Sequence, residues 1–270
     1  INVVNSTFTA NSCNGSGGAI YTASNLEVSG STFENNTANQ GGAVSIYKAN
    51  DNIQFDDCVF IGNDATNNGG SFWIQSHAYL YNISISNSTA ANNGGGIYAE
   101  GELTNNNLTF INNIALNGGG LYMNRNAANN LQTMTFTNNT ATQYGGGVYL
   151  SRGTNTLTNV NMTGNKAFSG SAIYSAVAFK LINAYLIKNQ ANSSSLTFAT
   201  YSEDTGEVVL LFKGKDKYLN AIYVTGSNRP TCTNVTYWNE NGIANTGSSA
   251  TTLPNAQDPT PEAGQNITVG

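Results

Sequence analysis

Apolar and polar residues alternate in short runs over about the first 192 residues of the chain. Within a run, the apolar side chains stand two positions apart, as on one face of a strand, and not three or four apart, as on a helix. β-Branched and aromatic residues fill the runs, and Gly, Asn and Ser separate them. The pattern therefore predicts many short β-strands.

These runs belong to an internal repeat. A large apolar residue recurs every 24 to 27 residues, at Phe8, Phe33, Phe60, Ile85, Phe110, Phe136, Met162 and Leu186. Three positions later lies Ser88 in one repeat and an asparagine in the others: Asn11, Asn36, Asn63, Asn113, Asn139, Asn165 and Asn189. Five positions later lies Cys13 and then a column of alanines: Ala38, Ala65, Ala90, Ala115, Ala141, Ala167 and Ala191.

One repeat has room for three short strands and three turns, which make one coil of a solenoid. Propeller blades are longer, and the consensus of leucine-rich repeats is absent. We therefore predict an all-β fold, a right-handed single-stranded parallel β-helix with about 24–28 residues per coil. Coils stack about 4.8 Å apart, so the asparagine column is expected to form a structural ladder of amide hydrogen bonds along the axis.

Each coil carries a second block, Gly-Gly followed by a small, a large apolar and usually an aromatic residue, first as GGAIY at 17–21. The glycines mark turns that need a positive φ or a close approach of two backbones. Because side chains alternate between faces along a strand, the apolar residue points inward and the aromatic one outward. The outward candidates for ligand binding are Tyr21, Trp73, Tyr98, Tyr122, Tyr149 and Tyr174. Either these rings form a platform for sugars or a partner protein, or they stack on one another and cover the turns.

The repeat divides the chain into three regions. Residues 1–192 form the β-helix, and residues 193–245 contain its last rungs and an atypical C-terminal cap, because a solenoid must cover its last open edge. Residues 246–270 are rich in Ser, Thr and Pro and are expected to be a linker toward a following domain. Since the chain begins inside a strand-like stretch, we expect a fragment of a larger anchored protein.

Three residues depart from the repeat. Asn105 interrupts an inward apolar column, and we expect Leu103 to replace it through a local shift of register. Cys13 and Cys58 occupy core columns two coils apart, which is too far for a disulfide. Both are expected to be small buried residues.

The composition limits the possible partners. Only 9% of the residues are charged, whereas Asn occurs 44 times and Gly 29 times, as is common in secreted β-rich surface proteins. A net charge of −5 with 10 Lys and Arg argues against nucleic-acid binding, which needs a dense basic face. No run of about 20 apolar residues is present, so we expect no direct membrane insertion of this fragment. The cysteine and histidine spacings fit no zinc site, and we expect no metal and no cofactor.

Some β-helix proteins are enzymes that cleave polysaccharides, and hydrolysis needs two carboxylates about 5–10 Å apart. The acids concentrate only in the third coil, at Asp51, Asp56, Asp57 and Asp64. This group favours a solvated loop over a hydrolase site or a calcium site. Glu100 and Glu102 share a face, but we expect no third group beside them on a neighbouring coil, and Arg125 is isolated. His77 is the only histidine, so we predict no catalytic residue.

GGAI at 17–20 and FxxN at Phe8, Phe33, Phe60, Phe110 and Phe136 resemble the two signature motifs of chlamydial polymorphic outer-membrane proteins. The fuller pattern, which includes NAIY at 220–223 and TNVTYWNENG at 233–242, resembles more closely the adhesin-like surface proteins of methanogenic archaea. The resemblance implies a β-helix stalk anchored outside the cell, and it supplies no catalytic residues.

We therefore predict an extracellular, non-catalytic adhesin module of the cell surface, whose partner is a surface protein or carbohydrate of another cell. A polysaccharide-active β-helix lyase or hydrolase and a purely structural spacer are the alternatives. A glycoprotein fits this role, but the composition alone produces about as many Asn-x-Ser/Thr sequons as the chain contains. They lie at Asn5, Asn14, Asn35, Asn82, Asn87, Asn107, Asn138, Asn161, Asn192, Asn234 and Asn266.

Overall fold

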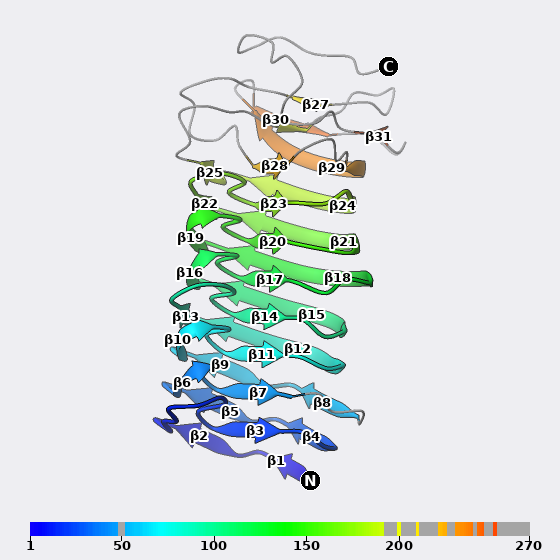
Figure 1. Ribbon diagram of the computed structural model, residues 1–270. Helices are drawn as coiled ribbons and strands as arrows, with labels where there is room; N and C mark the ends of the chain where they lie inside the picture. Colours follow the sequence, from blue (N-terminus) through cyan, green and yellow to red (C-terminus); the bar gives the residue numbers. More distant parts are fainter. Residues whose placement is uncertain are drawn as a thin grey trace.

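The computed structural model describes residues 1–47, 52–191, 199–200, 209–210, 221–225, 230–239, 242–245 and 251–252. Over these residues the chain winds upward from its N-terminus as a rod of stacked coils, with the strands lying across the rod axis (Figure 1). Three mainly parallel sheets run along its sides, which confirms the predicted parallel β-helix. Among these residues, no helix has the length and hydrophobicity needed to cross a membrane.

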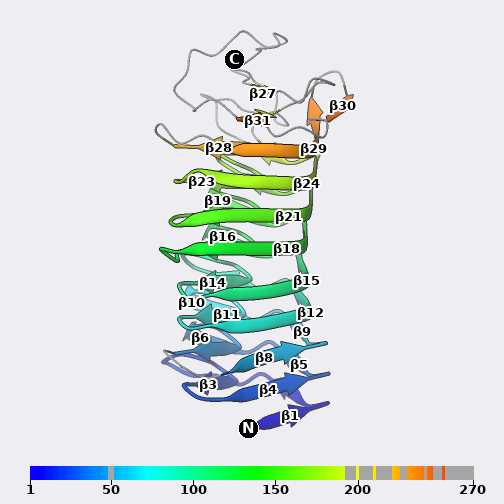
Figure 2. The same cartoon turned by 90° about the vertical axis from the view of Figure 1, so that its right-hand side faces the viewer.

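We name the sheets by their most evident feature. The long-strand sheet, which faces the viewer in Figure 2, contains β1 (Asn2–Val4), β2 (Thr7–Thr9), β4 (Leu26–Ser29), β5 (Thr32–Glu34), β8 (Ile53–Asp56), β9 (Val59–Ile61), β12 (Ala78–Ser86), β15 (Leu103–Ile111), β18 (Ala128–Thr137), β21 (Thr154–Thr163), β24 (Phe179–Ile187), β29 (Thr231–Asn239), β30 (Gly242–Asn245) and β31 (Thr251–Thr252). The alanine sheet contains β6 (Thr37–Gln40), β10 (Asp64–Asn68), β13 (Thr89–Ala90), β16 (Ile114–Asn117), β19 (Thr140–Tyr144), β22 (Lys166–Ala167) and β25 (Gln190–Ala191). The tyrosine sheet contains β3 (Ile20–Thr22), β7 (Val44–Ile46), β11 (Phe72–Ile74), β14 (Ile97–Ala99), β17 (Leu121–Met123), β20 (Val148–Leu150), β23 (Ile173–Ser175) and β28 (Ile222–Val224).

The stack continues beyond residue 192. β28 pairs in parallel with β23, and β29 pairs in parallel with β24. β30 and β31 then pair antiparallel with β29, and β26 (Ala199–Thr200) pairs antiparallel with β27 (Val209–Leu210). Apart from Thr251–Thr252, the predicted linker lies outside the described residues.

Equivalent residues of successive coils lie beside one another, as the repeat requires. Phe8 pairs with Phe33, Phe33 with Phe60, and Phe110 with Phe136. Their rings stack in the core with centroids 4.7, 4.6 and 4.6 Å apart. Such aromatic pairs add about 0.5–1.5 kcal/mol beyond the burial of their area. The apolar columns therefore stabilise the axial register as well as the core.

Residues in the left-handed conformation form the corners. In the coil around Phe110 these are Asn107, Asn112 and Gly118, with φ of 57°, 55° and 62°. Gly119 has a different reason to be glycine, because a Cβ there would lie 2.4 Å from the carbonyl oxygen of Gly146. Both predicted roles of the Gly-Gly pair, positive φ and close backbone approach, are thus confirmed.

The column asparagines hydrogen-bond along the axis, and all of them except the exposed Asn11 are buried inside the coils. Asn139 Nδ2 donates to Asn165 Oδ1 at 3.0 Å and to the carbonyl oxygen of Phe110 at 2.9 Å. Asn139 Oδ1 accepts from the backbone N–H and from Nδ2 of Asn113, at 3.0 and 2.9 Å. The same pattern joins Asn11 to Asn36, Asn36 to Asn63, Asn113 to Asn139 and Asn165 to Asn189. At Ser88 only the backbone half of the pattern remains, since its N–H donates to Asn113 Oδ1 at 2.9 Å. Its hydroxyl pairs instead with that of Ser71, with the two oxygens 2.8 Å apart.

Two sequence-based expectations are wrong. Asn105 stays in the inward column opposite Leu80, and the register between β12 and β15 does not shift. Its buried amide is satisfied because Nδ2 donates to the carbonyl oxygen of Gln132 at 2.6 Å. Cys13 is exposed, whereas Cys58 is buried as expected. Its backbone N–H donates to the Thr37 carbonyl oxygen of the next coil at 2.9 Å, while its side chain remains open to solvent.

Replacement of Asn139 by Leu should lower the free energy of unfolding by about 3 kcal/mol. The Asn113 N–H and the Phe110 carbonyl would lose a buried partner, and each loss costs about 1–3 kcal/mol. Urea unfolding followed by circular dichroism measures the loss. The control is Asn92→Leu, which removes an exposed amide bond to Asn67 and should change the free energy by less than about 1 kcal/mol. Equal effects of the two changes would contradict a structural role of the buried ladder.

Iodoacetamide should label only Cys13 in the native protein. Burial raises the pKa of the Cys58 and Cys232 thiols, and these groups are also inaccessible to the reagent. Peptide mass spectrometry before and after denaturation in urea distinguishes the three thiols. Rapid native labelling of Cys58 would show that the third coil is not packed as described.

Candidate functional site: two aromatic surfaces and a polar edge

Five tyrosines of the tyrosine sheet stack into one column, which we call the tyrosine ladder: Tyr98, Tyr122, Tyr149, Tyr174 and Tyr223. Their ring centroids are 5.3, 4.5, 4.8 and 5.0 Å apart along the axis, and the planes of adjacent rings differ by 11° to 27°. The in-register pairing of the strands places each ring over the next. Tyr144 also stacks on Tyr174 at 4.5 Å.

The ladder rings therefore cover one another's faces. Tyr98 and Tyr174 each keep only 8% of their surface exposed. A sugar ring or another flat group needs an uncovered aromatic face, and the ladder presents ring edges and hydroxyl groups instead.

Two of the six predicted binding aromatics lie outside the ladder. Ser45 separates Tyr21 from Trp73 in the register of the strands. Tyr21 is 53% exposed and stacks with Tyr47 at 6.1 Å. Trp73 Nε1 and Ser45 Oγ are buried without a hydrogen-bond partner. The predicted outward column therefore divides into the Tyr21–Tyr47 pair and the tyrosine ladder. Trp73 lies between them in the sequence and has its indole nitrogen buried.

Burial favours the protonated form of several ladder phenols, Tyr149 among them. It raises the pKa of Tyr149 to about 12, and the neighbouring Tyr122 and Tyr144 add to the shift. The pKa values of Tyr98 and Tyr174 are also raised, mainly by burial. The neutral Tyr98 hydroxyl donates to Glu100 at 3.1 Å and accepts from Asn124 at 3.0 Å.

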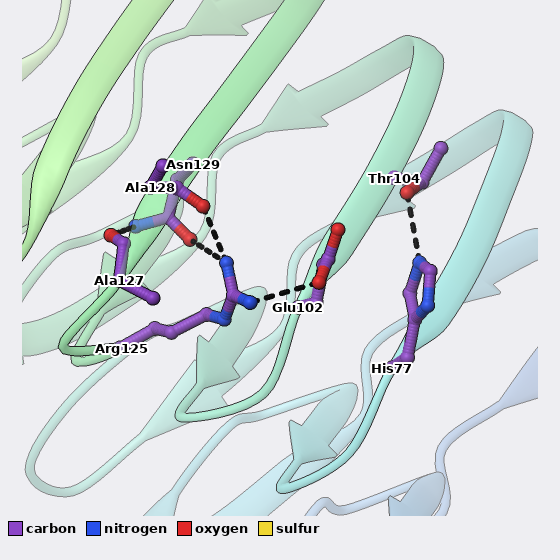
Figure 3. A network of polar contacts seen from close by, with 7 residues as sticks. All are labelled: His77, Glu102, Thr104, Arg125, Ala127, Ala128 and Asn129. Carbon is purple, nitrogen blue, oxygen red and sulfur yellow. Dashed lines mark hydrogen bonds and ion pairs between the residues drawn. The ribbon is translucent and has the colours of Figure 1, made fainter. Parts of the chain in front are cut away.

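A polar edge lies where the tyrosine sheet turns into the long-strand sheet (Figure 3). Arg125 Nη2 binds Glu102 Oε2 of the preceding coil at 2.8 Å, and Arg125 Nη1 donates to the Ala128 carbonyl oxygen. Glu100 accepts from Gln75 of the coil before it at 2.8 Å. The expectations that Arg125 is isolated and that the two glutamates lack a partner on a neighbouring coil are therefore wrong. The turns bring these residues together although about 25 positions separate them.

Both carboxylates of this edge already have protein partners. Glu100 is held by Tyr98 and Gln75, and Glu102 by Arg125. The contacts of Gln75 and Arg125 join one coil to the next, and that of Tyr98 lies within one coil. They make the edge a structural network with one exposed end, since the Glu102 side chain keeps 46% of its surface exposed.

The acids of the third coil do not come together. Asp56 ends β8 of the long-strand sheet, whereas Asp64 begins β10 of the alanine sheet. Asp57 lies at a bend with φ of 51° and accepts from Asn82 at 3.0 Å. Asp51 lies outside the described residues. Within the described part of the chain, no three His, Cys, Asp or Glu residues form a group that could hold a metal ion.

A second aromatic surface runs along one strand of the long-strand sheet, and the sequence-based prediction missed it. His77, Tyr79 and Tyr81, which we call the aromatic strip, follow one another along β12 and the turn before it. Ring centroids are 4.3 Å apart for His77 and Tyr79, and 6.4 Å apart for Tyr79 and Tyr81. His77 Nε2 shares a hydrogen bond of 2.8 Å with Thr104 Oγ1 (Figure 3). The alternation His-Ala-Tyr-Leu-Tyr carries the signal, because residues two apart in a strand share a face.

Most described sequons also occupy particular places in the fold. Asn5, Asn35, Asn82, Asn87, Asn107, Asn138 and Asn234 all have φ between 48° and 57°. These residues lie at the bends and corners of the long-strand sheet and are exposed. A left-handed bend favours Asn, and an outward strand position two residues later favours Thr. The fold therefore produces the sequon spacing without any requirement for a glycan.

These features define a parallel β-helix repeat protein. Residues 5–23, 30–47 and 133–151 match the family model of the Chlamydia polymorphic membrane protein repeat. Each match begins in the long-strand sheet and ends in the tyrosine sheet. The second and third pass through the alanine sheet, whereas the first has only the isolated bridges of Ser12 and Ser16 there. The chain thus carries repeats of the polymorphic membrane protein type. No curated protein and no solved structure matches it.

Alkaline pH should destabilise the fold through the tyrosine ladder. The pKa of Tyr149 is 10.0, its ordinary value, in the unfolded protein and about 12 in the folded protein. Below pH 10 both states keep the proton, so Tyr149 adds no pH dependence. Between these values the unfolded state releases a proton that the folded state retains, so unfolding becomes more favourable as pH rises. Melting temperatures at pH 8 to 12 should therefore fall less steeply in Tyr149→Phe than in the wild type, and identical slopes would contradict this role.

Proposed function

We propose that this chain is an extracellular, non-catalytic module of a cell-surface protein that mediates attachment to other cells or surfaces. The match of three coils to the polymorphic membrane protein repeat is the observation that carries this proposal. The name of that repeat associates its proteins with a membrane, which suits a rod displayed outside a cell. The residue types of the repeat serve the fold, because the phenylalanine, asparagine, alanine and glycine columns face the core, the ladder or the corners.

The surface of the rod supports an attachment role. Its outward strand positions are mainly Thr, Ser, Asn, Gln and Tyr, and charged residues are only 9% of the chain. Such a surface forms hydrogen bonds to sugars and to polar protein surfaces without strong selection by charge. The resemblance to adhesin-like proteins of methanogenic archaea supports the same role and makes a methanogen the proposed source. N-linked glycans on exposed sequons are part of the proposal.

A spacer is the second candidate, and the axial ladders favour it. The buried asparagines, the tyrosine ladder and exposed asparagine pairs such as Asn92–Asn67 and Asn107–Asn82 all run along the rod. Contacts of this kind join each coil to the next and make a rod suited to holding another domain away from the cell surface.

An antibody raised against residues 1–270 should label intact, unpermeabilised source cells. Beads coated with the folded chain should attach to such cells, and excess soluble chain should reduce attachment at least about twofold. Beads coated with the heat-unfolded chain are the control. Labelling that requires permeabilised cells would contradict the surface location. Labelled cells that do not bind the beads would favour the spacer.

A further inference from the structure

We propose that the aromatic strip binds a linear chain of neutral sugars laid along β12. This inference names the partner chemistry and rests on the proposed surface role. His77, Tyr79 and Tyr81 are half-buried, so each ring keeps part of its surface in contact with solvent.

The Tyr79–Tyr81 pair of the strip differs in ring geometry from the pairs of the tyrosine ladder. The planes of His77 and Tyr79 differ by 31°, and those of Tyr79 and Tyr81 by 39°. The His77 ring packs closely on one side of Tyr79, with centroids 4.3 Å apart. The Tyr79 and Tyr81 centroids are 6.4 Å apart, so these two half-buried rings do not cover each other's faces. A sugar ring carries C–H groups on one face, and these hydrogens are attracted to the electron-rich face of an aromatic ring.

Polar side chains of the two neighbouring strands flank the tyrosines. Tyr79 lies between Gln54 of β8 and Thr104 of β15. Tyr81 lies between Asp56 of β8 and Asn106 of β15 in the same way. Each tyrosine thus has two polar neighbours at one strand spacing, about 4.8 Å. Gln54, Asn106 and Asp56 offer amide and carboxylate groups, whereas the Thr104 hydroxyl already shares a hydrogen bond with His77. Aromatic faces beside hydrogen-bonding groups suit a ligand that has both apolar and polar faces, as a sugar ring does.

The charges around the strip favour a neutral ligand. Arg125 is the cation of the neighbouring polar edge, and it is already paired with Glu102. Asp56 lies beside Tyr81 and would repel carboxylate or sulfate groups, and the chain as a whole carries a net charge of −5. Hydroxyl groups can donate to the Asp56 carboxylate, whereas anionic sugars would meet a charge of the same sign.

Titration calorimetry of the full 270-residue chain tests the proposal with defined probes. These are linear hexasaccharides of β-1,4-linked glucose, N-acetylglucosamine and mannose, with hexagalacturonate as the anionic comparison. We expect at least one neutral hexasaccharide to bind, and hexagalacturonate to bind at least about tenfold more weakly. Binding of no neutral hexasaccharide, or stronger binding of hexagalacturonate, would overturn the proposal.

Variants then locate the site. Tyr79→Ala/Tyr81→Ala should weaken binding of that neutral hexasaccharide by at least about tenfold, because both ring faces are lost. Tyr79→Phe/Tyr81→Phe keeps the faces and should bind within about threefold of the wild type. Tyr185→Ala is the matched control, since this tyrosine is 40% exposed on β24 of the same sheet, away from the strip. Circular dichroism must show that each variant is folded, and undiminished binding by the folded double alanine variant would reject the site.

The bead assay separates this inference from the proposed function. Wild-type beads that attach to cells although no hexasaccharide binds would overturn the sugar site and leave the surface role standing. Strip-dependent sugar binding by a chain that labels only permeabilised cells would overturn the surface role and support the site.

Discussion

Parallel hydrogen bonding between coils fixes an axial spacing of about 4.8 Å, and the rest of the structure follows from that spacing. Each side chain lies directly above its equivalent in the preceding coil, so a residue type is favoured when it packs or bonds with a copy of itself. Phenylalanine does so by stacking 4.6 Å apart, and asparagine by donating and accepting along the axis. A charged residue in such a column would face a like charge, which accounts for a rod with few charges.

The same constraint decides which aromatic rings remain available to a partner. Rings aligned along the axis cover one another, as Tyr122 and Tyr149 do at 4.5 Å. Rings that follow one another along a single strand, such as Tyr79 and Tyr81, lie next to polar residues of the adjoining coils instead. Stacking along the axis therefore covers the rings of the tyrosine ladder, whereas Tyr79 and Tyr81, on one strand, are 6.4 Å apart and half-buried.

The corners of the coils explain where many of the Asn-x-Ser/Thr sequons lie. Each coil turns through residues with positive φ, and Asn107, Asn138 and Gly118 are among them. Asparagine tolerates this conformation better than most residues, and a strand begins soon afterwards. Sequons at such places follow from the backbone geometry, so their number is no measure of glycosylation. Their exposure on the long-strand sheet nevertheless means that any glycan there would stand close to the outer face of that sheet.

The sequence by itself determined the fold class, because the period of the repeat and its inward columns depend only on the alternation of side chains and the constant coil spacing. It also indicated the asparagine column and both roles of the Gly-Gly pair. Only the tertiary structure decided that Glu102 meets Arg125, that Asn105 stays in register by binding Gln132, and that Tyr98 is covered while Tyr21 is exposed. These outcomes depend on turns of unequal length and on contacts across about 25 residues. A periodic pattern specifies which residues are equivalent, but the geometry of each turn and its neighbours decides what an individual side chain contacts.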